Sequence, residues 1–424
     1  MCKIMGEEKE LEKNRGRDYN KKSNIPEKYT WICMETRKNR RNNRNRRQKM
    51  NITMNNSYIL LDIQRLRENT GAILEELPSG TKLIPVLKDD AYGLGVGAVL
   101  PVLQEFPDIR CIAVSHVSEG VDLRNLGWQK EVLVMGGTMK FLFPLAIEHE
   151  LTLAAGRLNM IPELTRICRE QGKKVKVQVK IETGLHRIGI LPGEELKTLA
   201  AELQKAQNIV QVTGAFTHFS KLSDPELTEK QYKLFMDGVK QLEESGISVP
   251  MCHAAGSAAW EQYPQYALDA VRLGRRLYMD HPTEPTGRIQ EVASWRTYIT
   301  NIRSLKAGDE LGYGGACILE QDAVAATIGV GYGDGLNMAL ADCHAPVLVG
   351  GKRARLLACC MDQAMIDVTG IDCRVDDEVT MFGWDSAGNY LSSQEVALLI
   401  GDNEGCGLIS DLSPRVTRVQ SESV

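Results

Sequence analysis

Short runs of apolar and β-branched residues alternate with stretches of helical periodicity over residues 83–272. The helical spacing is clearest at 194–206 and 226–244, and a first helix is predicted at 63–77. This alternation is typical of β-α units and a parallel sheet. The eight apolar runs are Leu83–Leu87, Cys111–Ser115, Glu131–Met135, Leu151–Ala154, Val175–Lys180, Val212–Thr217, Val249–Cys252 and Ala270–Arg272. They predict a (β/α)8 barrel, whose chemistry takes place at the carboxyl ends of the strands.

The pattern changes after about residue 280 to short β-rich segments separated by turn residues, as at 322–330, 345–357 and 378–384. Few long helical windows remain there, so an all-β domain is predicted. The predicted fold class is α/β plus all-β, with the barrel at 54–285 and a C-terminal β domain at 286–424. The strand-like residues 57–61 precede the first helix and are expected to pair with the β domain.

The composition is that of a globular protein. The chain has 424 residues, of which 43% are hydrophobic and 25% charged, and this excludes collagen-like and disordered classes. No apolar run approaches the ~18 residues of a membrane span, and no signal peptide is evident, so we expect a cytoplasmic protein without a membrane partner. The 11 cysteines are scattered without a C-x-x-C pair, which predicts reduced thiols and no metal site.

Charge is concentrated at the N-terminus. Residues 1–49 contain 16 Lys/Arg and 7 Asp/Glu, a net charge of +9, so the rest of the chain carries −13. The segment Arg37–Lys49 has no apolar periodicity, and we predict that residues 1–53 form a disordered basic leader. A basic run could bind nucleic acid, but the body of the chain is acidic, so no nucleic-acid partner is expected.

Lys88 closes the first predicted strand. Loss of water at the mouth of a barrel favours the neutral amine, which is the nucleophile that forms Schiff bases. Gly256 and Gly274 lie in the loops after strands seven and eight, where barrels commonly bind a phosphate. Other predicted strand ends also supply polar groups, namely Lys180, Arg187, His218, His253, Ser257 and Arg272. Together these residues predict a catalytic site at one face of the barrel.

In these segments the sequence resembles the alanine racemase family, whose members are pyridoxal 5'-phosphate enzymes with a barrel and a C-terminal β domain. The resemblance spans about residues 58–419. The family's segment around its cofactor lysine is similar to Lys88–Gly95, although Asp89 and Leu94 stand where the family usually has alanine and histidine. The other similar segments, in the family's order, are Val179–Gly189, Thr217–Phe219, His253–Ala258, Val271–Gly274, Leu311–Gly314, Gly331–Gly335 and Cys360–Gln363.

The resemblance implies a racemase that interconverts L- and D-alanine by a two-base mechanism. Lys88 would hold pyridoxal 5'-phosphate as an internal aldimine and act as one base. Tyr313 of the β domain would be the other base, and it would reach the active site of a partner subunit. The resemblance therefore also implies a homodimer with shared active sites.

A set of binding residues is implied as well. Arg272 would donate to the pyridine nitrogen, with His218 linking it to Tyr313. Lys180 matches a position that is often a carbamylated lysine, which orients Arg187. The remaining implied contacts are Tyr92, Ser257, Gly274 and Arg275 at the phosphate, Arg187 at the phenolic oxygen and the substrate, and Met361 and Asp362 beside the substrate.

One departure from the family leaves the substrate open. The family usually has a tyrosine near the C-terminus, at the phosphate and the substrate pocket, whereas the matching residues 402–407 contain none. A wider pocket would suit serine, so a serine or broader amino-acid racemase is the alternative. Arg275 stands where the family generally has an apolar residue, and its guanidinium either contacts the phosphate or points to solvent.

Two other classes of pyridoxal protein fit the sequence less well. A basic amino-acid decarboxylase with the same two domains has no need of the second base in Gly312–Gly314 or of the segment Met361–Gln363. A non-catalytic pyridoxal carrier would not need a β domain with Tyr313. Whether the enzyme supplies D-alanine as a peptidoglycan precursor or breaks D-amino acids down stays open.

Overall fold

The computed structural model describes residues 55–279, 287–403 and 405–421. The basic leader predicted at 1–53 lies outside these residues. All eight predicted strands of the first domain are present. They are β2 (Lys82–Pro85), β3 (Cys111–Val114), β4 (Glu131–Val134), β5 (Thr152–Ala155), β6 (Val175–Lys180), β7 (Val210–Phe216), β8 (Cys252–His253) and β9 (Ala270–Leu273).

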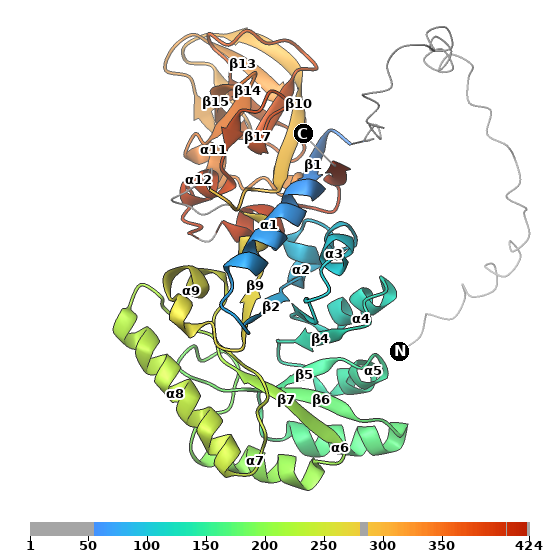
Figure 1. Ribbon diagram of the computed structural model, residues 1–424. Helices are drawn as coiled ribbons and strands as arrows, with labels where there is room; N and C mark the ends of the chain where they lie inside the picture. The colour runs from blue at the N-terminus through green and yellow to red at the C-terminus, as the bar shows by residue number, and fades with distance from the viewer. Residues whose placement is uncertain (1–54, 280–286, 404, 422–424) are drawn as a thin grey trace, which may run out of the picture. The chain divides into compact units, whose positions relative to one another are not determined.

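The eight strands form one closed parallel ring. Strands β3 to β8 pair in chain order, and β2 pairs with β9. Two parallel bridges join these groups, Val86 with Ala113 and Gly256 with Arg272. The predicted (β/α)8 barrel is therefore confirmed (Figure 1).

The helices of the barrel follow the strands along the chain. The predicted helix at 194–206 has the observed bounds of α7, and the one at 226–244 begins a residue earlier in α8. The helices are α1 (Ile63–Glu76), α2 (Lys88–Tyr92), α3 (Val96–Gln104), α4 (Val117–Asn125), α5 (Phe143–Glu148), α6 (Met160–Gln171), α7 (Glu194–Ala206), α8 (Pro225–Glu244), α9 (Ser257–Gln262) and α10 (Arg275–Tyr278), with 3-10 turns at Lys140–Leu142 and Pro264–Tyr266. None of the helices in the described ranges is long and apolar enough to cross a membrane.

Strand β6 shows how the alternation of the sequence places polar groups inside the barrel. Its sequence is VKVQVK, and the three valines are buried in the large apolar core. Successive side chains of a strand point to opposite faces. Gln178 and Lys180 accordingly lie inside the barrel. Oε1 of Gln178 is 2.7 Å from Nε2 of His253, and Nζ of Lys180 is 5.3 Å from the centre of the Phe216 side-chain ring.

The second domain is a nine-stranded sheet in the order β18-β17-β14-β15-β16-β13-β10-β1-β19. An added pairing of β17 with β10 closes six of these strands into a ring. The strands are β1 (Ser57–Asp62), β10 (Ala293–Leu305), β13 (Ala323–Ile328), β14 (Pro346–Val349), β15 (Lys352–Cys359), β16 (Ala364–Asp367), β17 (Glu378–Trp384), β18 (Tyr390–Leu391) and β19 (Thr417–Ser421).

Short elements complete this domain. The apolar stretch at 345–357 divides into β14 and β15 at Gly350 and Gly351, whose φ angles of 55° and 77° suit glycine. The short elements are β11 (Glu310–Leu311), β12 (Cys317–Ile318), α11 (Ala339–Asp342), α12 (Ser393–Leu398), α13 (Cys406–Ser410) and a 3-10 turn at Tyr332–Asp334.

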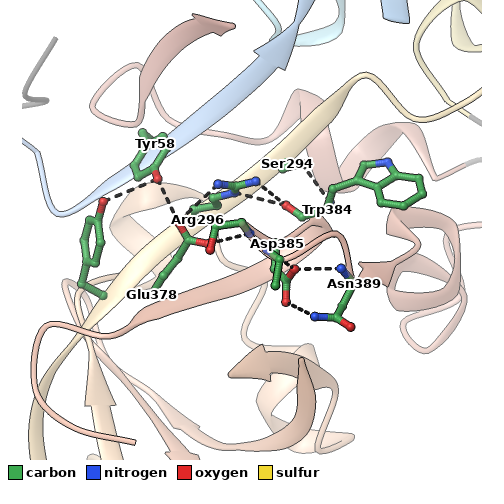
Figure 2. A network of polar contacts seen from close by, with 10 residues as sticks. Tyr58, Ser294, Arg296, Glu378, Trp384, Asp385 and Asn389 are labelled. Atoms are coloured by element: carbon green, nitrogen blue, oxygen red, sulfur yellow. Dashed lines mark hydrogen bonds and ion pairs between the residues drawn. The ribbon is translucent and has the colours of Figure 1, made fainter. Parts of the chain in front are cut away.

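Strand β1 belongs to the second sheet, as predicted for residues 57–61, because Ser57 pairs with Thr297 of β10. A polar network fixes it there (Figure 2). The hydroxyl of Tyr58 donates to Glu378 at 3.3 Å, and the same carboxylate receives a 3.3 Å contact from the buried Arg296. The domain limits themselves, 54–285 and 286–424, stay a prediction, since the border falls in residues 280–286, outside the described ranges.

Candidate active site

Lys88 stands at the carboxyl end of β2, at the start of an unusual turn. Residues Asp89–Tyr92 all have φ between 50° and 57°, in the left-handed region. This conformation costs each L-residue roughly 1–2 kcal/mol, so the turn needs external support. Glu119 accepts a 2.6 Å hydrogen bond from the Asp89 N–H, and Nε of Arg418 donates to the Gly93 carbonyl at 2.8 Å. Supports from two distant segments thus hold the lysine in place.

A cradle suited to a phosphate lies beside this turn. The hydroxyl of Ser257 accepts from the backbone N–H groups of Gly274 and Arg276, each at 3.3 Å. A Cβ at Gly274 would lie 2.2 Å from the hydroxyl of Tyr92, so only glycine fits there. The structure therefore brings together Tyr92, Ser257 and Gly274, three of the residues predicted at the phosphate.

Arg272 occupies the interior of the barrel at the end of β9. Its guanidinium donates to the carbonyls of Thr217, His253 and Ala254 at 2.8–3.0 Å. Its Nη2 also lies 3.3 Å from Nδ1 of His218. Burial lowers the pKa of Arg272 to about 9, so the group stays charged at neutral pH. Burial and then the charge of Arg272 lower the pKa of His218 to about 3, which keeps this imidazole neutral.

Lys180 is the last residue of β6, and its amine has few hydrogen-bond partners. Its side chain is buried, and its hydrogen bond to the Ile181 carbonyl is long, at 3.5 Å. Burial, followed by the charges of Arg272 and Arg187, lowers the pKa of Lys180 to about 7. A substantial fraction of this amine is therefore neutral at physiological pH. Arg187 itself is exposed, in the loop after β6.

The predicted residues of the β domain lie on its surface. Tyr313 is 75% exposed, in the loop between β11 and β12, with left-handed glycines at 312, 314 and 315. Met361 is 49% exposed. The neighbouring Asp362 accepts a 2.7 Å bond from Nη2 of Arg415, whose Nε lies 2.8 Å from buried Asp334. Arg415 thus fixes the carboxylate of Asp362, a residue predicted from the sequence to lie beside the substrate.

Arg275 differs from both expectations for its side chain. The expectation that its guanidinium points to solvent is wrong. The guanidinium is buried and lies 2.5 Å from a carboxylate oxygen of Glu261, which is buried as well. Contact of the guanidinium with a phosphate is not favoured either, since it already binds this carboxylate. Buried charges need such a partner, which explains an arginine at an otherwise apolar position.

Sequence reasoning missed three residues that support the site. Glu119 and Arg418 hold the turn of Lys88 from segments far along the chain. Gln178 accepts the hydrogen bond of His253, the second imidazole beside Arg272. The polar position in the middle of β6 was the only sequence signal for Gln178. Among the described residues, no cluster of three His, Cys, Asp or Glu side chains could hold a metal ion.

Comparison with known proteins identifies the family. Residues 61–282 match the N-terminal domain of alanine racemase, and residues 292–420 match its C-terminal domain. The alanine racemase of Desulforamulus reducens is 33% identical over 350 residues, which are 80% of this chain and 92% of that protein. The structure is similar to that of alanine racemase from Clostridium difficile 630, with a TM-score of 0.78 and 27% identity over 87% of this chain and 96% of the other.

A second solved structure shows the same fold with a small molecule bound. It is alanine racemase from Bacillus anthracis with bound L-Ala-P, which has a TM-score of 0.78 and 26% identity over 85% of this chain and 94% of the other. The relatives named here are alanine racemases, so the serine racemase alternative is not favoured. The predicted family is confirmed, and the chain belongs to the alanine racemases, a family of isomerases.

Proposed function

We propose that the protein interconverts L- and D-alanine with pyridoxal 5'-phosphate as its cofactor. The observation that supports this most is the convergence of Lys88, Tyr92, Ser257, Gly274 and Arg272 at one end of the barrel. The close approach of Tyr92 to Gly274 forms a cradle that a Cβ would fill. Hydroxyl and backbone N–H donors are the groups that bind a phosphate, so these residues fit the cofactor.

Different residues of the chain would bind different parts of the cofactor. Ser257, Tyr92 and the N–H groups at Gly274 and Arg276 would hold the phosphate. Arg272 would face the pyridine nitrogen, and its positive charge at neutral pH would keep a proton off that nitrogen. When bound, the cofactor withdraws electrons from an attached amino acid, so that its α-proton becomes acidic.

Racemisation needs a proton donor and a proton acceptor on opposite faces of the substrate. We assign one face to the amine of Lys88, which lies 5.4 Å from the centre of the Tyr92 ring. The phenol of Tyr313 would act on the other face. Arg187, Met361 and Asp362 would border the substrate, with Asp362 held by Arg415.

The exposure of Tyr313 supports a homodimer with shared sites. Tyr313 is 75% exposed and Ile318, on strand β12 of the same hairpin, is 59% exposed, and a partner subunit would cover this apolar surface. A second copy of the chain would receive Tyr313 in its own site. The proposed compartment is the cytoplasm, since the nine described cysteines are all free thiols.

Lys180 is proposed to react with carbon dioxide. Its neutral amine attacks the carbon of carbon dioxide, and an N–C bond forms while one C=O π bond opens and its electron pair moves to oxygen. The nitrogen then releases a proton to water, which leaves an anionic carbamate. The burial of Lys180 and its lowered pKa supply the neutral amine. The carbamate would lie near the positive charges of Arg272 and Arg187 and would orient Arg187.

Steady-state racemisation of L- and D-alanine, with L-serine as the comparison, tests the proposed activity. We expect turnover of alanine in both directions, slower turnover of serine, and none in Lys88→Ala. Reduction with borohydride should bleach the cofactor and leave a pyridoxyl group on Lys88. A pyridoxyl group on another lysine, or no turnover of alanine, would overturn the proposal.

A further inference from the structure

A second hollow lies at the other end of the barrel, where the strands begin. Its volume is about 430 Å³, within the range of small-molecule sites. Its wall includes Glu131, Thr152 and Val175, the first residues of β4, β5 and β6, together with Gln211 of β7. Lys88 and Arg272 lie at the carboxyl ends of their strands, so this basal hollow is separate from the candidate active site.

Five cations line the basal hollow, and neutral carbonyls hold three of them. Arg124 donates to four main-chain carbonyls at 2.7–3.1 Å. Lys130 donates to the carbonyls of Pro107 and Ile109 at 3.3 and 2.7 Å, and Lys173 donates to that of Glu148 at 2.9 Å. Carbonyls fix the position of a cation but leave its net charge in place.

The other two cations, Lys174 and Lys176, are exposed and line the same hollow. Neither forms a hydrogen bond or an ion pair with any residue that the structure describes. Lys176 begins the inward-facing row of β6 that continues through Gln178 to Lys180. Two amines without a hydrogen-bond partner among the described residues and three cations fixed by carbonyls therefore line one hollow.

The acids of the wall do not balance these charges. Glu131 accepts hydrogen bonds from Thr152 at 2.9 Å and Thr213 at 3.4 Å, which direct its carboxylate toward the threonines. Glu150 is the second acid of the wall. Five cations against two acids leave a charge of +3 on the lining. A concave surface of this kind concentrates anions.

We propose that the basal hollow binds a small anion with two or more negative charges, of the phosphate or carboxylate type. Ammonium and guanidinium groups form charge-assisted hydrogen bonds with both kinds of oxyanion. The backbone carbonyls preorganise Arg124, Lys130 and Lys173, so that mainly Lys174 and Lys176 must be ordered when the anion binds. The amides of Gln129 and Gln211 offer further donors.

Calorimetric titration with pyrophosphate, and separately with citrate, tests this site on the cofactor-loaded protein freed of excess cofactor. The bound cofactor blocks the phosphate cradle. A constant ionic strength keeps the screening of charges equal in all titrations, so that differences in affinity reflect the site. The wild type should bind one anion per chain. Lys174→Gln/Lys176→Gln should lose about tenfold or more in affinity, or ~1.4 kcal/mol. Binding of only one of the two probes would identify which oxyanion class the site takes.

Two further variants distinguish binding at the basal hollow from a general effect of the protein's net charge. Lys230→Gln/Lys352→Gln removes two exposed lysines elsewhere and should leave the affinity unchanged. Glu150→Gln removes an acid of the wall and should tighten binding, the opposite direction to a loss through misfolding. Absence of binding to both probes, equal losses in the two double variants, or weaker binding in Glu150→Gln would overturn the proposal.

Discussion

Arg272 donates a 2.7 Å hydrogen bond from Nη1 to Nδ1 of His253. A guanidinium can only donate, so Nδ1 must accept and the single proton of the imidazole lies on Nε2. That proton is donated to Oε1 of Gln178 at 2.7 Å. Burial, together with the charges of Arg272 and Lys180, lowers the pKa of His253 well below its ordinary value. The arginine is thus positioned by an imidazole that stays neutral across the physiological range.

Gln178→Leu should destabilise the fold, because it leaves the buried Nε2–H of His253 without an acceptor. The expected loss in the free energy of unfolding is about 1–3 kcal/mol, measured by urea denaturation. Gln207→Leu, at an exposed position, is the matched control and should change stability little. An unchanged midpoint for Gln178→Leu would argue against the hydrogen-bond chain.

Tyr313→Phe should affect the two enantiomers differently. If the phenol acts on one face only, exchange of the α-proton with solvent should be abolished from one enantiomer and partly retained from the other. NMR in deuterated water would follow each enantiomer separately. The matched control is Tyr332→Phe, in the 3-10 turn of the β domain. Equal and modest losses for both enantiomers would contradict the two-base assignment.

Mixed dimers test whether Tyr313 acts in the site of a partner. Lys88→Ala and Tyr313→Ala chains are each expected to be inactive alone. In a heterodimer one of the two sites would receive both intact residues, so random assembly should restore about a quarter of wild-type sites. Co-expression with two affinity tags would isolate the heterodimer for assay. An inactive but pure heterodimer would rule out the shared site.

Lys180 should make stability depend on pH. Its pKa is lowered from 10.5 in the unfolded chain to about 7 in the fold, so the unfolded chain binds more protons between these values. This group therefore adds stability as pH rises from about 7 to 10.5, and its full penalty applies below about 7.

Lys180→Met should then be more stable than wild type below pH 7, by an amount of order 5 kcal/mol, and the difference should vanish toward pH 10.5. Buffers free of carbon dioxide keep the amine unmodified for this comparison. Added bicarbonate should narrow the difference if the carbamate forms, and mass spectrometry with ¹³C-bicarbonate would locate it. A difference that is constant over the whole pH range would contradict the lowered pKa.

Much of the fold follows from local patterns in the sequence. The strands of the barrel and helix α7 were predicted because their apolar periodicity is regular, and residues 57–61 were placed in the second sheet because they precede the first helix. The left-handed turn at Asp89–Tyr92 could not be predicted, since none of its residues is glycine. Glu119 and Arg418, which support it, are 30 and 325 residues from their partners, beyond the reach of local patterns.

The clamp between Arg418 and Gly93 has a consequence for biosynthesis. Gly93 leaves the ribosome early, whereas Arg418 belongs to β19, the last strand of the described chain. The same strand pairs with β1, so the two ends of the described chain meet in one sheet. A nascent chain can therefore form much of its barrel while the turn that bears Lys88 is still unclamped. Glu119 can support this turn early, whereas the contact from Arg418 can form only after the chain has been extended by a further 325 residues beyond Gly93.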